Sequence, residues 1–141
     1  MSVDNKAMQV GYQFPPVSKK ITEDMLCSYS GRYPGVYVDT IHVSREAALG
    51  WGFKDLVLQG SQTMNFSTEM LFKIYREHWI NNSKLTVKFT KPVFNGETVT
   101  ARGEVIDRKE AQDGKIRLTI NVWAENTSGD KIMVGEAEVS V

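Results

Sequence analysis

A histidine and a glycine at the start of a long apolar run are the residues of this chain best suited to act together in chemistry. His42 can transfer protons, because an imidazole changes its protonation state near neutral pH. Gly60, between Gln59 and Ser61, precedes a run with apolar residues at helical spacing. The free amides and positive dipole of such a helix start can polarise a carbonyl, and glycine allows close approach. The spacing therefore predicts a proton-transfer site that faces a carbonyl-binding helix end.

Two side chains shortly before His42 could assist it. Asp39 could orient the imidazole or share a water with it, or it could only cap a turn by bonding to its own backbone. Tyr37 could donate a hydrogen bond, but a phenol titrates near pH 10 and is a poor base, so it could instead line a pocket. The other residues could also have purely structural roles. His42 could be structural, Gly60 could serve only a turn, and Gln59 could fix a loop rather than bind a ligand.

Composition narrows the class of protein. The 141 residues suit one domain, and 17 basic residues balance 17 acidic ones, unlike the basic surface of a nucleic-acid binder. The sequence has no run of membrane-spanning length. Its single cysteine, Cys27, cannot form an internal disulfide, which favours the cytoplasm. Two histidines and one distant cysteine offer no metal-ligand spacing, so we expect no metal and no other cofactor.

Short elements are expected in the first half of the chain. Residues 11–21 contain two prolines and read as an extended or edge segment. Thr22 is a candidate N-cap for a helix that ends by Ser30-Gly31. Ser44 is a second candidate N-cap, followed by a short helix over residues 45–49 that two glycines terminate.

The longest predicted element begins at Gly60 or Ser61 and runs to about Trp79. At 1.5 Å per residue it would be close to 30 Å long. After it the period of the apolar residues changes to two, which is typical of strands. Turn signals at Asn95-Gly96, Asp113-Gly114 and Ser128-Gly129 separate predicted strands at 85–90, 98–107, 116–124 and 133–141. This order predicts an α+β fold in which a curved antiparallel sheet wraps a long central helix.

Short motifs in a fixed order carry a resemblance to a known family. They are Ser30-Gly31, Asp39-Thr40-Ile41-His42, Ala47-Ala48, Gly52-Phe53, Gln59-Gly60 and the run 84–99. Together they resemble the hot-dog fold, and specifically the MaoC-like acyl dehydratase and (R)-specific enoyl-CoA hydratase family. The resemblance implies a single hot-dog domain over residues 1–141. It also implies a homodimer or higher homo-oligomer with the pocket between subunits. The polar composition of the first residues indicates that 1–8 are flexible.

One departure from the family pattern concerns the catalytic carboxylate. In the hydratases that define the family, a catalytic Asp lies five residues before the histidine, and here that place holds Tyr37. The family's Asn-Pro pair corresponds to Asp39 and Thr40. The chain therefore looks similar to a divergent branch that keeps the histidine but lacks the standard Asp.

The resemblance implies a hydro-lyase that adds or removes water across the α,β-bond of an acyl thioester, carried on coenzyme A or a carrier protein, without a cofactor. His42 would move the proton, with help from Asp39 or Tyr37, while Gln59, Gly60 and Ser61 would bind the substrate. Two alternatives stay open. One is a tailoring dehydratase, cyclase or isomerase of a non-thioester, polyketide-like substrate; the other is a non-catalytic acyl-binding hot-dog subunit. Neither a nucleic acid nor a membrane is an expected partner.

Overall fold

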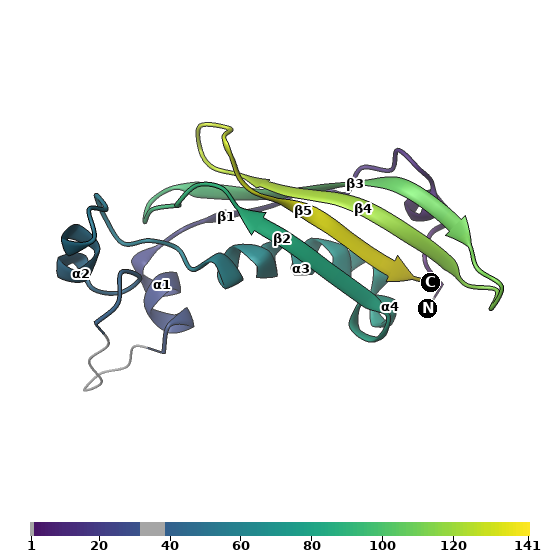
Figure 1. Cartoon of the computed structure of the whole chain (residues 1–141), viewed down its shortest axis with the longest axis horizontal. Helices are drawn as coiled ribbons and strands as arrows, with labels where there is room; N and C mark the ends of the chain where they lie inside the picture. The colour runs from purple at the N-terminus through teal and green to yellow at the C-terminus, as the bar shows by residue number, and fades with distance from the viewer. Residues whose placement is uncertain (1, 32–38) are drawn as a thin grey trace.

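A five-stranded antiparallel sheet curves over one central helix (Figure 1). The structure is a computed structural model that describes residues 2–31 and 39–141. The strands are β1 (Val17–Lys20), β2 (Ser83–Phe89), β3 (Thr98–Glu110), β4 (Ile116–Glu125) and β5 (Lys131–Ser140). Their order in the sheet is β1-β3-β4-β5-β2, so β1 and β2 lie at its edges. The α+β prediction is confirmed, as is the edge position predicted for the segment that contains β1.

Within the described residues, four α-helices and one short 3₁₀ helix accompany the sheet. They are η1 (Asn5–Met8), α1 (Glu23–Tyr29), α2 (Arg45–Gly50), α3 (Gly60–Tyr75) and α4 (Glu77–Asn81). Both predicted N-caps are confirmed. The Thr22 hydroxyl accepts the amide of Met25 at 3.2 Å, and the Ser44 hydroxyl accepts that of Ala47 at 3.2 Å. Across residues 2–31 and 39–141, no helix is long and apolar enough to cross a membrane.

The central helix α3 is shorter than predicted. It ends at Tyr75 after 16 residues, about 24 Å at 1.5 Å per residue, rather than near Trp79. Arg76 interrupts it with φ 51° and ψ −123°, a backbone conformation that is rare for any residue except glycine, and α4 follows in a new direction. Because apolar residues continue at helical spacing through this break, the sequence pattern did not reveal it.

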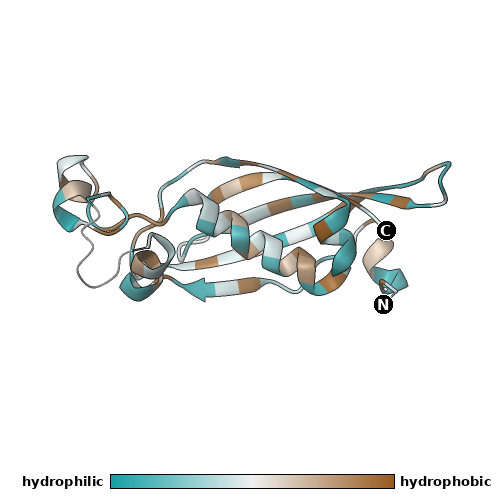
Figure 2. Cartoon of the chain, turned by 90° about the horizontal axis from the view of Figure 1, so that it is seen from below, coloured by the Kyte–Doolittle hydropathy of each residue, from teal (hydrophilic) through white to brown (hydrophobic). Residues whose placement is uncertain are grey.

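The core lies between α3 and the concave face of the sheet. Figure 2 shows α3 lying across that face, with apolar positions on the strands behind it. The sheet side of α3 buries Thr63, Phe66, Ser67, Met70, Leu71 and Tyr75. The ladder between β3 and β4 shifts register between Val105 and Asp107, an irregularity of the kind that increases local twist and curvature. Gly103 on β3 lets the helix come close, since a Cβ there would lie 2.9 Å from the terminal carbon of Met70.

The N-terminal segment is tied to the far end of α3. Residues 5–8 form η1, and Ala7 is buried. The flexibility expected of residues 1–8 stays a prediction. The hydroxyl of Tyr75 donates a hydrogen bond to the carbonyl of Ala7 at 2.8 Å. The ring of Phe14 packs edge-on against Tyr75, with centroids 5.7 Å apart. Burial raises the pKa of Tyr75, so its hydroxyl remains a donor at any physiological pH.

Candidate active site

His42 is held in one tautomer by a backbone carbonyl. Its Nδ1 lies 2.7 Å from the carbonyl oxygen of Val57, and the ring is half-buried. A carbonyl oxygen can only accept, so Nδ1 must carry the proton in this hydrogen bond. In the neutral ring Nε2 is then left with its lone pair available. The amide of Val57 bonds back to the carbonyl of Ile41 at 3.0 Å, which fixes the position of the histidine turn.

Val57 is itself fixed by the segment that follows β2. It pairs with Phe94 in an isolated bridge, and the amide of Leu58 donates to the carbonyl of Val93 at 2.8 Å. The amide of Asn95 donates to the carbonyl of Leu56 at 3.0 Å. The side chains of Leu56 and Leu58 are buried, which anchors this strand-like segment in the core. The carbonyl that holds His42 therefore belongs to a rigid part of the fold.

The start of α3 offers two backbone donors. Gln59 is the N-cap, and its side chain makes no capping hydrogen bond. The amides of Gln62 and Thr63 both donate to the carbonyl of Gln59, at 3.1 and 3.3 Å. Within the described residues, the amides of Gly60 and Ser61 have no acceptor. The positive end of the helix dipole adds to their attraction for a partly negative oxygen.

The chain limits the distance between these donors and the backbone that holds His42. Val57 precedes Gly60 by three residues, which places their Cα atoms no more than about 11 Å apart even in a fully extended chain. Because Val57 holds the imidazole, ring and amides belong to the same small region at the end of the molecule where α1 and α2 lie (Figure 1).

Side-chain hydrogen bonds join the end of α1 to the start of α3. The amide nitrogen of Gln59 donates to the hydroxyl of Ser30 at 2.7 Å. The hydroxyl of Tyr29 donates to that of Ser61 at 3.0 Å, and the side-chain amide of Asn65 donates to Tyr29 at 3.3 Å. Sequence reasoning missed Tyr29 and Asn65. The one available signal was that Tyr29 directly precedes the family-like Ser30-Gly31 pair.

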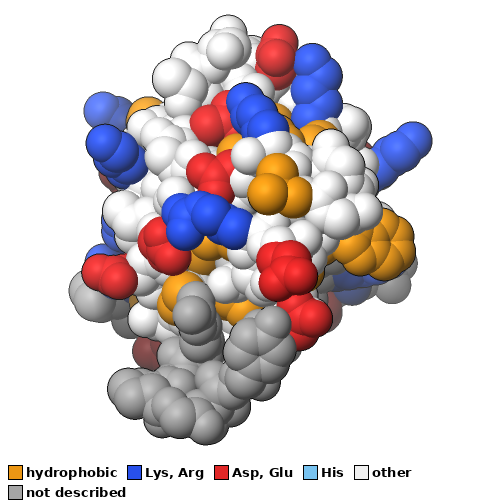
Figure 3. All heavy atoms as spheres, turned by 90° about the vertical axis from the view of Figure 1, so that its left-hand side faces the viewer, with side chains coloured by type: hydrophobic (Ala, Val, Ile, Leu, Met, Phe, Trp, Pro, Cys, Tyr) orange, Lys and Arg blue, Asp and Glu red, His pale blue; other side chains and the backbone are white. Residues whose placement is uncertain are grey.

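A fork of ion pairs fixes α2 to the same region. The guanidinium of Arg45 forms two hydrogen bonds to the carboxylate of Glu23, at 3.2 and 2.8 Å, and lies 3.4 Å from Asp55. The hydrogen bond to Glu23 is the main reason that the pKa of Arg45 is raised. Figure 3 shows this end of the molecule, where side chains of both signs are interleaved. The surface in that view therefore has no extended patch of one sign among the described residues.

The predicted assistants of His42 are placed differently. Asp39 is exposed, and the Nδ1 that an orienting carboxylate would hold is bonded to Val57 instead. A backbone carbonyl therefore already orients the imidazole through Nδ1. The sharing of a water and the capping of a turn both stay open for Asp39. Tyr37 lies outside the described residues.

An open hollow lies beside the start of α3. It has a volume of about 370 Å³ and is lined by residues that include Gly60, Thr63, Phe89 and Val93. Gly60 is in contact with its wall, since a Cβ on this residue would lie 2.8 Å from the ring of Phe89. A larger side chain at this position would therefore have to displace the ring of Phe89.

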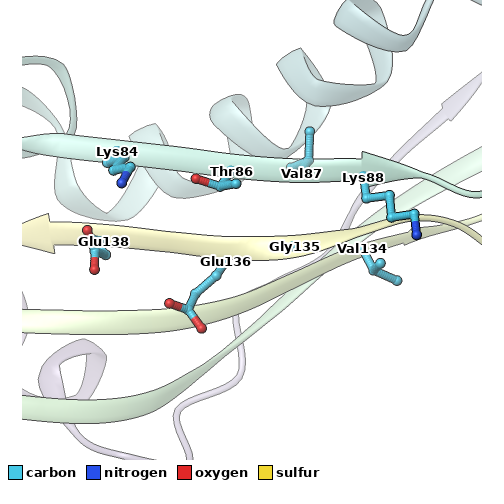
Figure 4. A pocket seen from close by; sticks show the side chains of 8 residues that line it. All are labelled: Lys84, Thr86, Val87, Lys88, Val134, Gly135, Glu136 and Glu138. Carbon is cyan, nitrogen blue, oxygen red and sulfur yellow. The ribbon is translucent and has the colours of Figure 1, made fainter.

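A second hollow of about 470 Å³ lies over β2 and β5 (Figure 4). Lys84 and Lys88 come from β2, and Glu136 and Glu138 come from β5. Lys84 stands opposite Glu138 in the strand register, so opposite charges neighbour each other across the two strands. Among the residues that the structure describes, its lining contains no histidine or cysteine. We place the candidate site at the start of α3 because His42 and the unpaired helix amides belong to connected segments there.

Fold and site together define a protein of the hot-dog class. The model of the MaoC-like domain family matches residues 15–127, and the chain belongs to this family. No curated protein matches the chain by sequence.

Solved structures share the fold at low sequence identity. An (R)-hydratase of A. caviae involved in PHA biosynthesis is 20% identical, with 94% of this chain and 96% of that one covered and a TM-score of 0.75. An R-hydratase of Pseudomonas aeruginosa is 21% identical, with coverages of 94% and 86% and a TM-score of 0.70. The HadBC complex of Mycobacterium tuberculosis, a 3R-hydroxyacyl-ACP dehydratase, is 16% identical, with coverages of 94% and 96% and a TM-score of 0.71.

Proposed function

We propose that this protein is a cofactor-free hydro-lyase that adds or removes water across the α,β-bond of an acyl thioester. Membership of the MaoC-like family supports the reaction class. The observation that carries the proposal is the hydrogen bond from His42 Nδ1 to the carbonyl of Val57, which leaves Nε2 as a base. The acyl group would be carried on coenzyme A or on a carrier protein, as in the 3R-hydroxyacyl-ACP dehydratase that shares the fold.

In the hydration direction, Nε2 of His42 removes a proton from water as the water oxygen bonds to the β-carbon. The electron pair of the double bond moves toward the thioester carbonyl and generates an enolate. The amides of Gly60 and Ser61 stabilise the developing negative charge on its oxygen. Nε2 of His42 then gives its newly acquired proton to the α-carbon, which restores the neutral imidazole, and dehydration is the same sequence in reverse.

Asp39 and Tyr37 are the candidates that assist His42. Asp39 is exposed and would share the attacking water rather than orient the ring. Tyr37 would donate a hydrogen bond to the water or line the acyl pocket. Gln59, tied to Ser30, would keep the helix start in place and present its amide to the substrate.

A homodimer or higher homo-oligomer with the pocket between subunits completes the proposal. The structurally similar HadBC dehydratase is a complex, which supports assembly. Apolar side chains also remain exposed on the outer side of α3 and on the edge strand β2, where Phe72 and Phe89 are 38% and 47% exposed. We place the protein in the cytoplasm because its single cysteine needs no oxidising compartment.

The two histidines of the chain provide a matched test. Enoyl thioesters of several chain lengths, on coenzyme A and on a carrier protein, are assayed with the wild type and with His42→Ala and His78→Ala. We expect His42→Ala to lower kcat/KM by about 10²–10⁴, the usual contribution of a general acid–base residue. His78 lies in α4, at the other end of α3, and its replacement should leave kcat/KM unchanged. Full activity of His42→Ala on every accepted thioester would remove the proton-transfer role.

The exposed position of Asp39 also favours a second candidate function, in which His42 lacks a carboxylate partner for acid–base catalysis. The chain would then act on a free, polyketide-like substrate as a dehydratase, cyclase or isomerase, or bind acyl groups as a non-catalytic subunit. Turnover of free substrates in the same panel would indicate the tailoring enzyme. Tight acyl binding without turnover would indicate the binding subunit, and turnover should then appear only when a second hot-dog subunit is added.

A further inference from the structure

Three polar side chains at the start of α3 form a continuous chain of hydrogen bonds. Asn65 Nδ2 lies 3.3 Å from the phenol oxygen of Tyr29, and that oxygen lies 3.0 Å from the hydroxyl oxygen of Ser61. Tyr29 is the last residue of α1, while Ser61 and Asn65 are one turn apart on α3. The proposed reaction did not use Tyr29 or Asn65.

The chemistry of the three groups sets the direction of this chain. The amide nitrogen of Asn65 can only donate, so the phenol oxygen of Tyr29 accepts there. The single proton of Tyr29 is then donated to the oxygen of Ser61. Ser61 accepts that bond and keeps its own proton, for which the described residues offer no acceptor. The chain therefore ends in an O–H donor on the second residue of α3.

We propose that the hydroxyl of Ser61 is a third hydrogen-bond donor to the substrate's thioester oxygen and that Tyr29 is the positioning residue that orients it. The inference rests on the proposed function, because it assigns a role at the same carbonyl site. The hydroxyl belongs to the residue that also carries one of the two free amides. Tyr29 both accepts from Asn65 and donates to Ser61, and hydrogen bonds linked in this way strengthen one another. This donor would offset part of the transition-state stabilisation that the chain loses by lacking the standard carboxylate.

A purely structural link between α1 and α3 makes different predictions. Such a link would lower stability when broken, but it would not change the polarisation of a bound carbonyl. Tyr29→Phe keeps the aromatic ring and removes only the hydroxyl that links Asn65 to Ser61. Ser61→Ala removes the donor, and Ser61→Thr keeps a hydroxyl. Thr22→Ala weakens α1 at its N-cap and leaves the hydrogen bonds among Asn65, Tyr29 and Ser61 intact, so it controls for loosening of the helix.

The first measurement does not depend on turnover. Butyryl-coenzyme A labelled with ¹³C at the carbonyl is bound to each variant, and its carbonyl stretch is recorded by difference infrared spectroscopy. We expect a low frequency in the wild type, in Ser61→Thr and in Thr22→Ala, with a higher one in Tyr29→Phe and Ser61→Ala. An unchanged frequency in Tyr29→Phe would overturn the inference and leave the proposed function intact. Absence of binding by the wild type itself would instead overturn the thioester assignment, and the inference with it.

The second measurement is a double-mutant cycle on crotonyl-coenzyme A hydration. Removing one donor to a developing oxyanion costs about 10²–10³ in kcat in the best-studied case. Here two amides remain, and we expect about a 10-fold loss for Ser61→Ala and slightly less for Tyr29→Phe, with little change in KM. The double variant should be no slower than Ser61→Ala, because Tyr29 acts only through Ser61. Independent, multiplying losses would show that Tyr29 does not act through that hydroxyl.

Discussion

The two ends of α3 are built in opposite ways. At its C-terminal end Tyr75 is fully buried, packs against Phe14 and donates its hydroxyl proton to Ala7. At its N-terminal end the amides of Gly60 and Ser61 have no acceptor among the described residues. An unsatisfied helix start costs stability, and the packed far end offsets that cost. One helix thus separates the group that stabilises the fold from the groups available for a ligand.

The strongest test of this contrast is Tyr75→Ala. It removes a large buried aromatic side chain together with its hydrogen bond to Ala7. We expect the free energy of unfolding, measured by urea denaturation, to fall by about 3–5 kcal/mol. The hydratase rate per folded molecule should stay within twofold of the wild type. A fall in that rate as large as that of His42→Ala would show that the two ends are not separable.

Gly60→Ala, at the opposite end of α3, should lower hydratase activity as well as stability. The new Cβ would lie 2.8 Å from the ring of Phe89, which must shift, and we expect a loss of about 1–2 kcal/mol in unfolding free energy. Hydratase activity should fall by at least about tenfold, because the side chain obstructs approach to the helix amides. Adding Phe89→Ala should restore stability beyond the sum of the single effects. Strict additivity in this cycle would contradict the contact.

Tyr75→Phe isolates one hydrogen bond at the packed end. The ring remains, but the carbonyl of Ala7 loses its donor. We expect a loss of about 1 kcal/mol in unfolding free energy and faster hydrogen exchange within η1, with no effect on catalysis. Unchanged exchange in η1 would mean that this bond does not hold the N-terminal segment.

The smallest effect is expected from Glu69, midway along α3. Hydrogen bonds from Lys73, and then from Lys19, lower the pKa of this carboxylate. Its contribution is therefore present above the unfolded pKa of about 4.3 and is lost as the pH falls through the lower folded value. The side chain is about one-third exposed, so Glu69→Gln should cost only about 0.5 kcal/mol at pH 7. Urea denaturation between pH 7 and pH 2 should show this difference disappear in acid, whereas a constant difference would contradict the linkage.

Local signals in the sequence predicted much of the fold. Thr22 and Ser44 cap α1 and α2 as expected because capping depends on neighbouring residues alone. The glycines of the three predicted turns all have positive φ, the conformation that makes glycine favourable there. The break at Arg76 could not be predicted in this way. It has no proline or glycine, and the apolar period continues across it.

The site was only partly accessible from the sequence. His42 and Gly60 were identified by residue type and motif order, and the structure places them on connected segments. The partner of His42 is the backbone of Val57, which carries no side-chain signature. Tyr29 meets Ser61 across 32 positions of the chain, a tertiary contact that spacing alone does not reveal.

Phe89 lies both on an edge strand of the sheet and beside the start of α3. It is the last residue of the edge strand β2, and its ring also covers Gly60. A strand edge carries unpaired backbone groups, to which another polypeptide can add. Any chain that docks along this border must touch or displace the same ring. If a second copy of this chain adds to that edge, dilution of the protein should change the quaternary state and the entry of ligands together.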